Sequence, residues 1–135
     1  MSAEGENRRV LIVDDDRQIR RVLSEFFTGS GYDCRQAANG AEGLVRFTAD
    51  RPPLTVTDVD MPAMNGLEFL RQARAIDPDA AFLVLTGVGD IQTAVESLKF
   101  GAYDFILKPV NLDGIYALDP LNKVLAAAGE SQISS

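Results

Sequence analysis

This sequence contains almost none of the residues that bind soft metal ions or cross-link a chain: it has no histidine and a single cysteine, Cys34. One cysteine cannot form an internal disulfide, and it cannot supply a cysteine metal cluster. We therefore expect a reducing compartment, with Cys34 filling space in the core. Any metal site in this chain has to use oxygen ligands.

The sequence also lacks a long apolar run and a cluster of basic residues. Its longest apolar run, AAFLVL at 80–85, is too short to span a bilayer, and no apolar segment of signal-peptide length follows the polar start MSAEGENRR. The formal net charge of -7 argues against a surface that binds nucleic acid. We expect a cytoplasmic domain that binds neither nucleic acid nor a membrane directly.

What is present suffices for one domain with one core. A chain of 135 residues with 46% hydrophobic content buries roughly two thirds of its unfolded surface on folding. We expect this domain over residues 9–129, between a disordered N-terminal tail at 1–8 and a C-terminal tail at 130–135. No tandem repeat or low-complexity segment interrupts it.

Short apolar runs alternate with amphipathic segments along the chain. The runs predict five strands, at 9–13, 32–37, 54–57, 80–85 and 103–107. The four segments between them predict helices whose inward residues are Ile19, Val22, Leu23, Phe26 and Phe27; Ala41, Leu44 and Val45; Leu67, Leu70 and Ala73; and Ile91, Ala94, Val95 and Leu98. Asn39 and Asp90 are predicted helix caps. This alternation predicts an α/β fold, a parallel sheet covered on both faces.

Right-handed crossovers bring the carboxyl ends of parallel strands to one edge of a sheet. The residues that follow the strands are Asp14, Asp15 and Asp16 after the first, Asp58 after the third, Thr86 and Gly87 after the fourth, and Lys108 and Pro109 after the fifth. Taken singly, each has an ordinary explanation; acids before a helix, for example, favour its dipole by up to about 1 kcal/mol. Together they predict a crevice that binds a ligand.

The carboxylates of that crevice predict a metal ion. Close acidic pairs repel by roughly 4 kcal/mol at an effective dielectric near 20, so folding would avoid them unless a cation were bound. Oxygen ligands select a hard cation, and Mg²⁺, with Mn²⁺ as its substitute, suits a site that also holds a phosphate. The charges of Asp14, Asp15, Asp58 and Lys108 with a divalent ion sum to zero, so an anionic phosphoryl group can approach. Asp58 is then the nucleophile, and Thr86 and Lys108 contact the phosphoryl oxygens.

Four motifs carry a family resemblance: LIVDDD, TDVDMPAMNG, LVLTG and YDFILKP. In order and position they resemble the response-regulator receiver domain of two-component signalling, a family of chemotaxis-regulator-like proteins, across residues 9–110. The resemblance implies a flavodoxin-like fold, a doubly wound five-stranded parallel sheet of order 2-1-3-4-5 with helices on both faces. It implies that Asp58 takes a phosphoryl group from a sensor histidine kinase or phosphotransfer protein. Having no histidine, this chain cannot be the phosphohistidine donor.

The resemblance also assigns individual roles. It places Mg²⁺ on Asp15, Asp58 and the backbone carbonyl of Asp60, with Asp14 acting through water, and it makes the domain a signalling phosphoacceptor that catalyses only its own phosphorylation and dephosphorylation. Thr86 and Phe105 become switch residues, although Phe105 could equally be a core ring. An effector domain or output protein would contact the face made by the helix at 90–100, the fifth strand and the last helix. A dimer that forms on phosphorylation is a further alternative.

Three questions stay open from the sequence. TDVDMP also fits a haloacid-dehalogenase-like phosphatase that uses Asp58 and Asp60, although that signature usually follows a chain's first strand. The last helix either restarts at Pro120 or is one helix kinked there. The chain is either a stand-alone regulator or the front end of a longer protein, and neither its kinase nor its output can be identified from the sequence.

Overall fold

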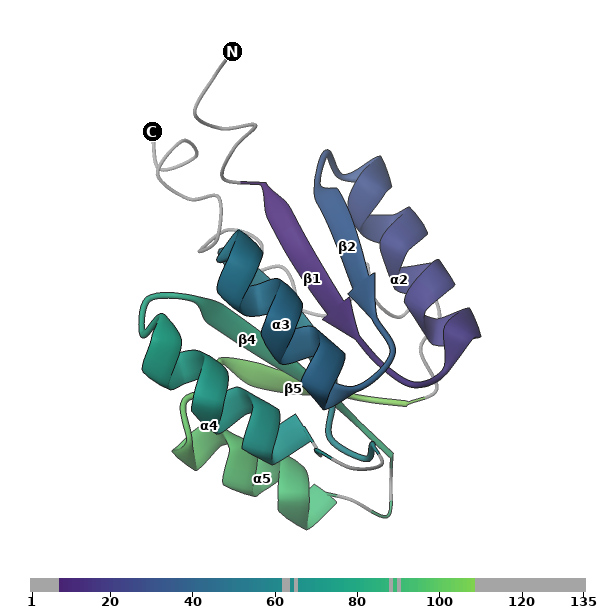
Figure 1. Ribbon diagram of the computed structural model, residues 1–135. Coiled ribbons are helices and arrows are strands. Elements are labelled where there is room, and N and C mark those ends of the chain that lie inside the picture. Colours follow the sequence, from purple (N-terminus) through teal and green to yellow (C-terminus); the bar gives the residue numbers. More distant parts are fainter. Residues whose placement is uncertain (1–7, 62–63, 65, 88, 90, 109–135) are drawn as a thin grey trace, which may run out of the picture.

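The computed structural model describes residues 8–61, 64, 66–87, 89 and 91–108. Its strands are β1 (Arg9–Val13), β2 (Asp33–Ala37), β3 (Leu54–Asp58), β4 (Ala81–Thr86) and β5 (Asp104–Leu107). Its helices are α2 (Arg17–Gly29), α3 (Gly40–Asp50), α4 (Gly66–Ile76) and α5 (Ile91–Lys99). All strand pairs are parallel, and the sheet order is β2-β1-β3-β4-β5 (Figure 1). The predicted α/β class and strand order are confirmed.

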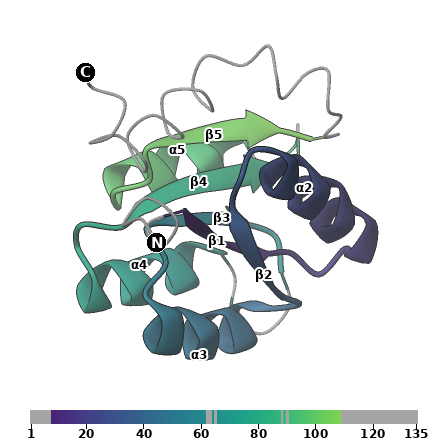
Figure 2. The ribbon, with the colours of Figure 1, turned by 90° about the horizontal axis from the view of Figure 1, so that it is seen from above.

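Two apolar clusters cover the two faces of the sheet. In β1, Val10 and Ile12 belong to the cluster under α2, whereas Leu11 and Val13 belong to the cluster under α3 and α4. Figure 2 shows α2 on one side of the sheet and α3 and α4 on the other. Both faces of the central strands are buried, so β1 and β4 are almost entirely apolar, and in β3 the two threonines, Thr55 and Thr57, are buried as well. Cys34 is half-buried and packs against the α2 cluster.

Helix α3 turns a different face to the sheet from the one predicted. Its buried residues are Gly40, Gly43 and Phe47, while Ala41 is exposed and Val45 is 70% exposed. A Cβ atom on Gly43 would lie 3.1 Å from Val13 and 3.2 Å from Phe69. Glycine therefore lets this helix approach the sheet closely, and the predicted inward placement of Ala41 and Val45 is wrong.

Helix α5 shows the same kind of departure. Ala94 is buried as predicted, but Val95 and Leu98 are each 39% exposed, so their predicted inward placement is wrong. Ser97 is buried as well, and its hydroxyl donates to the Ala94 carbonyl at 2.6 Å. Among the described side chains of α5, the small residues Ala94 and Ser97 are thus buried, and the larger Val95 and Leu98 are at the surface. The predicted inward placement of Ile91 concerns a side chain outside the described part of the chain.

The remaining helix predictions agree better with the structure. Leu23, Phe26 and Phe27 in α2, and Leu70 and Ala73 in α4, are buried. Ile19, Val22, Leu44 and Leu67 are half-buried. The predicted cap Asn39 accepts a hydrogen bond from the Glu42 amide at 2.8 Å, and the Glu42 side chain accepts one from the Ala38 amide at 2.8 Å. This pair is a variant of the capping box, in which the glutamate contacts the amide of the residue before the cap.

Several predictions concern residues outside the described part of the chain. These are the cap Asp90, the helix start or kink at Pro120, the C-terminal tail and all but Arg8 of the N-terminal tail. Within the part of the chain that the structure describes, no helix has both the length and the apolar character needed to cross a membrane.

Gly66 holds the start of α4 against the end of β3. Its amide donates to the Val59 carbonyl at 3.1 Å. A Cβ atom at Gly66 would press against the carbonyl oxygen of Asp58 and lie 2.6 Å from the Cα of Val59. Both neighbours are backbone atoms that cannot move aside without displacing the strand end, so only glycine fits here.

We expect Gly66→Ala to destabilise the domain by about 3 kcal/mol, at the upper end of the range for overpacking. The measurement is urea unfolding followed by circular dichroism. The matched control is Gly29→Ala, because a Cβ on Gly29 meets nothing within 4 Å. Alanine there should leave stability unchanged or raise it by up to about 1 kcal/mol. Equal stabilities for the two variants would contradict the close approach at Gly66.

Candidate functional site

The three consecutive acids after β1 occupy three different environments. Asp14 is fully buried: its amide donates to the Ala37 carbonyl at 3.1 Å, and its Oδ1 accepts from the Asp16 amide at 2.8 Å. Asp15 is exposed. Asp16 caps α2 by accepting from the Gln18 amide at 2.8 Å. Asp16 is therefore a helix cap, whereas the side chain of Asp14 is buried at the edge of the sheet.

Lys108 joins the ends of β1 and β3. Its ammonium lies 3.1 Å from Asp58 Oδ2 and 3.4 Å from Asp14 Oδ2. Its amide donates to the Thr86 carbonyl at 2.8 Å, which fixes the lysine at the end of β5. Asp58 is 2% exposed, and its Oδ1 accepts from the Asp60 amide at 3.2 Å. Both oxygens of Asp58 are thus held by positive or donating groups.

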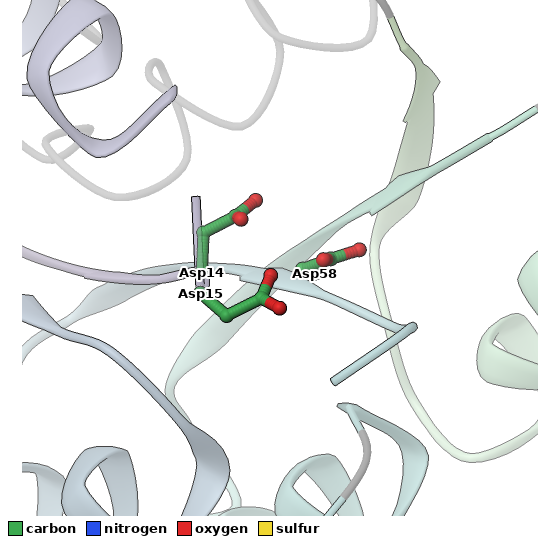
Figure 3. A group of neighbouring side chains, drawn as sticks. All are labelled: Asp14, Asp15 and Asp58. Carbon is green, nitrogen blue, oxygen red and sulfur yellow. The ribbon is translucent and has the colours of Figure 1, made fainter. Parts of the chain in front are cut away.

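Three carboxylates gather at this edge of the sheet. Asp14, Asp15 and Asp58 each offer one oxygen, and these oxygens lie within 4.8 Å of one another. Figure 3 shows Asp14 and Asp15 extending from adjacent positions toward Asp58 on the neighbouring strand. The predicted convergence of these residues is therefore a feature of the structure.

Burial dominates the ionisation of this cluster. The pKa of Asp14 rises from its usual 3.8 to about 6, mainly because the carboxyl is buried. The hydrogen bond from the Asp16 amide lowers this pKa, and the charge of Asp58 raises it. Burial also raises the pKa of Asp58, although the Asp60 amide and Lys108 oppose this. For Lys108, burial lowers the pKa, but the charges of Asp14 and Asp58 outweigh it and the pKa rises. Lys108 stays charged, and the acid cluster keeps an excess of negative charge.

This donor set is compatible with a divalent metal ion. Among the described residues Asp14 Oδ2 has no hydrogen-bond partner, and only the ion pair with Lys108 compensates its burial. A buried carboxylate oxygen without a hydrogen bond is unfavourable unless a cation approaches it. Asp15 and Asp58 offer further carboxylate oxygens beside it. Oxygen-only ligands select hard cations, so the residues present fit such an ion.

A cavity of about 430 Å³ opens beside the cluster. Its described lining consists of Asp15, Asp16, Asp58, Asp60, Gly87 and Lys108. Thr86 is buried at the end of β4 and does not belong to that lining; its hydroxyl donates to the Gly87 carbonyl at 3.2 Å. Phe105 is partly buried and packs against the cluster under α3 and α4. The structure thus brings Asp15, Asp58 and Lys108 to the cavity, whereas the two switch candidates, Thr86 and Phe105, are not part of its described lining.

Sequence reasoning missed Arg20. Its side chain donates to the main-chain carbonyl of Asp14 at 2.7 Å. The signal that could have found it is its position four residues after Asp16, one turn into a helix that starts at the acid loop.

Known proteins resemble this chain in sequence and in fold. Residues 10–118 match the model of the response regulator receiver domain family. The chemotaxis protein CheY of Thermotoga maritima is 36% identical over 118 residues, covering 87% of this chain and 97% of that protein. The crystal structure of a response regulator receiver domain protein from Clostridium thermocellum superposes with a TM-score of 0.80 at 27% identity, covering 94% of this chain and 98% of the other. The chain belongs to the response regulator receiver domain family.

Another relative is much longer than this chain. The C4-dicarboxylate transport transcriptional regulatory protein DctD of Rhizobium meliloti is 38% identical over 104 residues, which is 77% of this chain but only 23% of that protein. The chain therefore spans about a quarter of this relative, and the similarity concerns the receiver domain alone.

We expect Asp14→Asn to stabilise the metal-free domain at pH 7 by about 1–3 kcal/mol, because each unit of pKa shift corresponds to about 1.4 kcal/mol. The folded state binds the Asp14 proton more tightly than the unfolded chain does. The wild type therefore loses this part of its stability as the pH rises from about 4 to about 6, and the gain of the variant should vanish below that range. Urea unfolding in chelator at several pH values measures both effects.

Asp16→Asn is the matched control for this prediction. Asp16 is exposed, and asparagine caps a helix about as well as aspartate. Its substitution should not give the gain in stability at pH 7 that is expected of Asp14→Asn. A loss of stability in Asp14→Asn at pH 7 without metal would show that burial of the Asp14 charge is not unfavourable.

Proposed function

We propose that this domain takes a phosphoryl group onto Asp58 from the phosphohistidine of a sensor histidine kinase or phosphotransfer protein, in a Mg²⁺-dependent reaction in the cytoplasm. The observation that carries the proposal is the placement of the Asp58 carboxylate at the cavity wall. There Lys108 and the Asp60 amide hold its two oxygens, and Asp14 and Asp15 stand beside it. In the transfer the P–N bond of the donor breaks as an Asp58 O–P bond forms, and the imidazole nitrogen keeps the electron pair.

Each neighbour of Asp58 has a distinct role in this proposal. The Lys108 ammonium, 3.1 Å from Asp58 Oδ2, can pair with a phosphoryl oxygen. Asp15, Asp58 and the backbone carbonyl of Asp60 would hold Mg²⁺, with Asp14 acting through water; Mn²⁺ would serve in its place. When bound, the cation neutralises charge on the incoming phosphoryl group. The Thr86 hydroxyl would leave the Gly87 carbonyl to contact the phosphoryl group.

The alternative is a phosphatase of the haloacid-dehalogenase type that uses Asp58 as nucleophile and Asp60 as general acid. Membership of the receiver family argues for a signalling phosphoacceptor instead. The position of Asp58 on the third strand, β3, with the acid pair after β1, supports the same choice. A receiver turns over only its own phosphoryl group, whereas such a phosphatase would release phosphate continuously from small phosphoesters.

The proposed output surface lies on α5 and β5, with the last helix outside the described residues. Several apolar side chains of this region are 39–45% exposed: Val95, Leu98, Phe100, Tyr103 and Leu107. Exposed apolar side chains on neighbouring elements are what an interaction surface requires. We propose that this face binds an effector domain or output protein, or a second copy of the chain after phosphorylation.

The isolated domain should acquire one phosphoryl group from acetyl phosphate, and only when Mg²⁺ is present. Intact-mass spectrometry measures the adduct, which Asp58→Asn and chelator should both abolish. The matched control is Asp33→Asn, because Asp33 is an exposed acid paired with Arg35 away from the site. An adduct that persists in Asp58→Asn would place the acceptor elsewhere. Continuous release of phosphate from p-nitrophenyl phosphate would favour the phosphatase.

We expect phosphorylation of Asp58 to change the surroundings of Phe105 by way of Thr86. We expect beryllofluoride with Mg²⁺, which mimics the phosphoryl group, to shift the amide NMR signals of Thr86, Phe105 and α5. Thr86→Ala should remove the distant shifts while Asp58 remains modifiable, and Thr86→Ser, which keeps the hydroxyl, should preserve them. Shifts confined to the acid cluster would leave Phe105 as a core residue only.

A further inference from the structure

Arg20 connects α2 to the acid loop and to β2. Its Nη1 donates to the main-chain carbonyl of Asp14 at 2.7 Å, and its Nε donates to the side-chain oxygen of Gln36 at 3.2 Å. The side chain is half-buried. Neither hydrogen bond goes to a carboxylate, so the guanidinium supports the backbone of the loop and does not neutralise an acid directly.

The carbonyl that Arg20 holds belongs to the peptide group between Asp14 and Asp15. Asp14 is also held by the hydrogen bond from its amide to Ala37, by the Asp16 amide on Oδ1 and by Lys108 on Oδ2, and Arg20 adds the contact to its carbonyl. The orientation of this peptide group also sets the direction in which the Asp15 side chain leaves the backbone. Asp15 is exposed, and its side chain has no hydrogen bond within the described part of the chain. Its placement in the cluster therefore depends on its backbone.

We propose that Arg20 is a positioning residue for the metal site, which keeps the peptide group between Asp14 and Asp15 oriented so that Asp15 is preorganised beside Asp14 and Asp58. The inference rests on the proposed function, because it assumes that these carboxylates hold Mg²⁺. Gln36 supports Arg20 in turn: the Nε contact fixes the plane of the guanidinium, and Nη1 is then aimed at the carbonyl. A residue that positions the ligands of a metal commonly contributes about 10- to 100-fold to the affinity of the site for that metal.

Charge and geometry predict opposite effects of removing Arg20. The guanidinium places a positive charge near a site for a cation, so by charge alone Arg20→Ala would strengthen Mg²⁺ binding. By geometry alone, the loss of the hydrogen bond frees the peptide group, so Arg20→Ala would weaken Mg²⁺ binding. The sign of the change in affinity therefore separates a positioning role from an electrostatic one.

The experiment is isothermal titration of the full chain with Mg²⁺. We expect Arg20→Ala to raise the dissociation constant by about 10-fold or more. Arg20→Lys should have an intermediate dissociation constant, because an ammonium can donate to the Asp14 carbonyl but cannot donate to Gln36 at the same time. Gln36→Ala should weaken binding by a few-fold. The matched control is Arg17→Ala, which removes an exposed arginine from the same helix and should leave the affinity unchanged or slightly raised.

A second readout does not depend on metal. In the metal-free protein the carbonyl ¹³C signal of Asp14 should shift in Arg20→Ala and in Arg20→Lys and stay in place in Arg17→Ala, since it reports the hydrogen bond directly. Urea unfolding shows whether each variant is folded. If Arg20→Ala does not fold, Arg20→Lys and Gln36→Ala decide the question.

The outcomes separate this inference from the proposed function. If the wild type does not bind Mg²⁺, the proposed function fails. If the wild type binds Mg²⁺ and Arg20→Ala binds it equally well or more tightly, the metal site stands and the positioning role of Arg20 is overturned. Weaker binding in Arg20→Ala, with partial rescue by lysine, supports the role.

Discussion

This site depends on one interaction, in which the ammonium of Lys108 pairs with the buried carboxylates of Asp14 and Asp58. Asp14 and Asp58 lie at the ends of neighbouring strands, and both have lost nearly all their contact with water. Their charges repel each other, and burial raises the pKa of each. Lys108 reaches them from β5, beyond β4, and offsets part of this repulsion. The site can therefore form only when three strands end at the same level.

The rest of the structure serves this alignment. Gly66 lets α4 begin directly against the backbone of Asp58 and Val59, and Gly43 lets α3 lie close over Val13 and Phe69. Arg20 ties the carbonyl of Asp14 to α2 and β2. The contacts at Gly66 and the Arg20 contact with Asp14 involve backbone atoms at the strand ends, so they set the positions from which Asp58 and Asp14 extend. The positions from which Asp14 and Asp58 extend are thus set by contacts from α2, α3 and α4.

One lysine does not fully compensate this cluster. Asp14 Oδ2 is buried without a hydrogen bond in the part of the chain that the structure describes, and exposed Asp15 adds a third charge beside the cavity. Buried polar atoms of this kind lower stability, and proteins retain them where a ligand needs them. The metal-free domain therefore carries an unfavourable charge cluster, and a cation bound there would relieve it.

The sequence by itself determined the class of fold and the composition of the site. Apolar strands alternating with helices require a parallel sheet, and parallel strands deliver Asp14, Asp58 and Lys108 to one edge whatever the details of packing. It did not determine the buried faces of α3 and α5. Periodicity counts large apolar residues, whereas these helices approach the sheet through Gly43 and through Ala94 with Ser97.

Only the tertiary structure decided how the three adjacent acids divide their roles. Asp14 is buried, Asp15 faces the cavity and Asp16 caps a helix. The same holds for the contact between Arg20 and the Asp14 carbonyl. The order of residues places these groups near one another, but the direction of a side chain depends on the backbone dihedrals and on the neighbours that pack against it. Those neighbours come from strands and helices far away in the sequence, so local sequence patterns cannot contain that information.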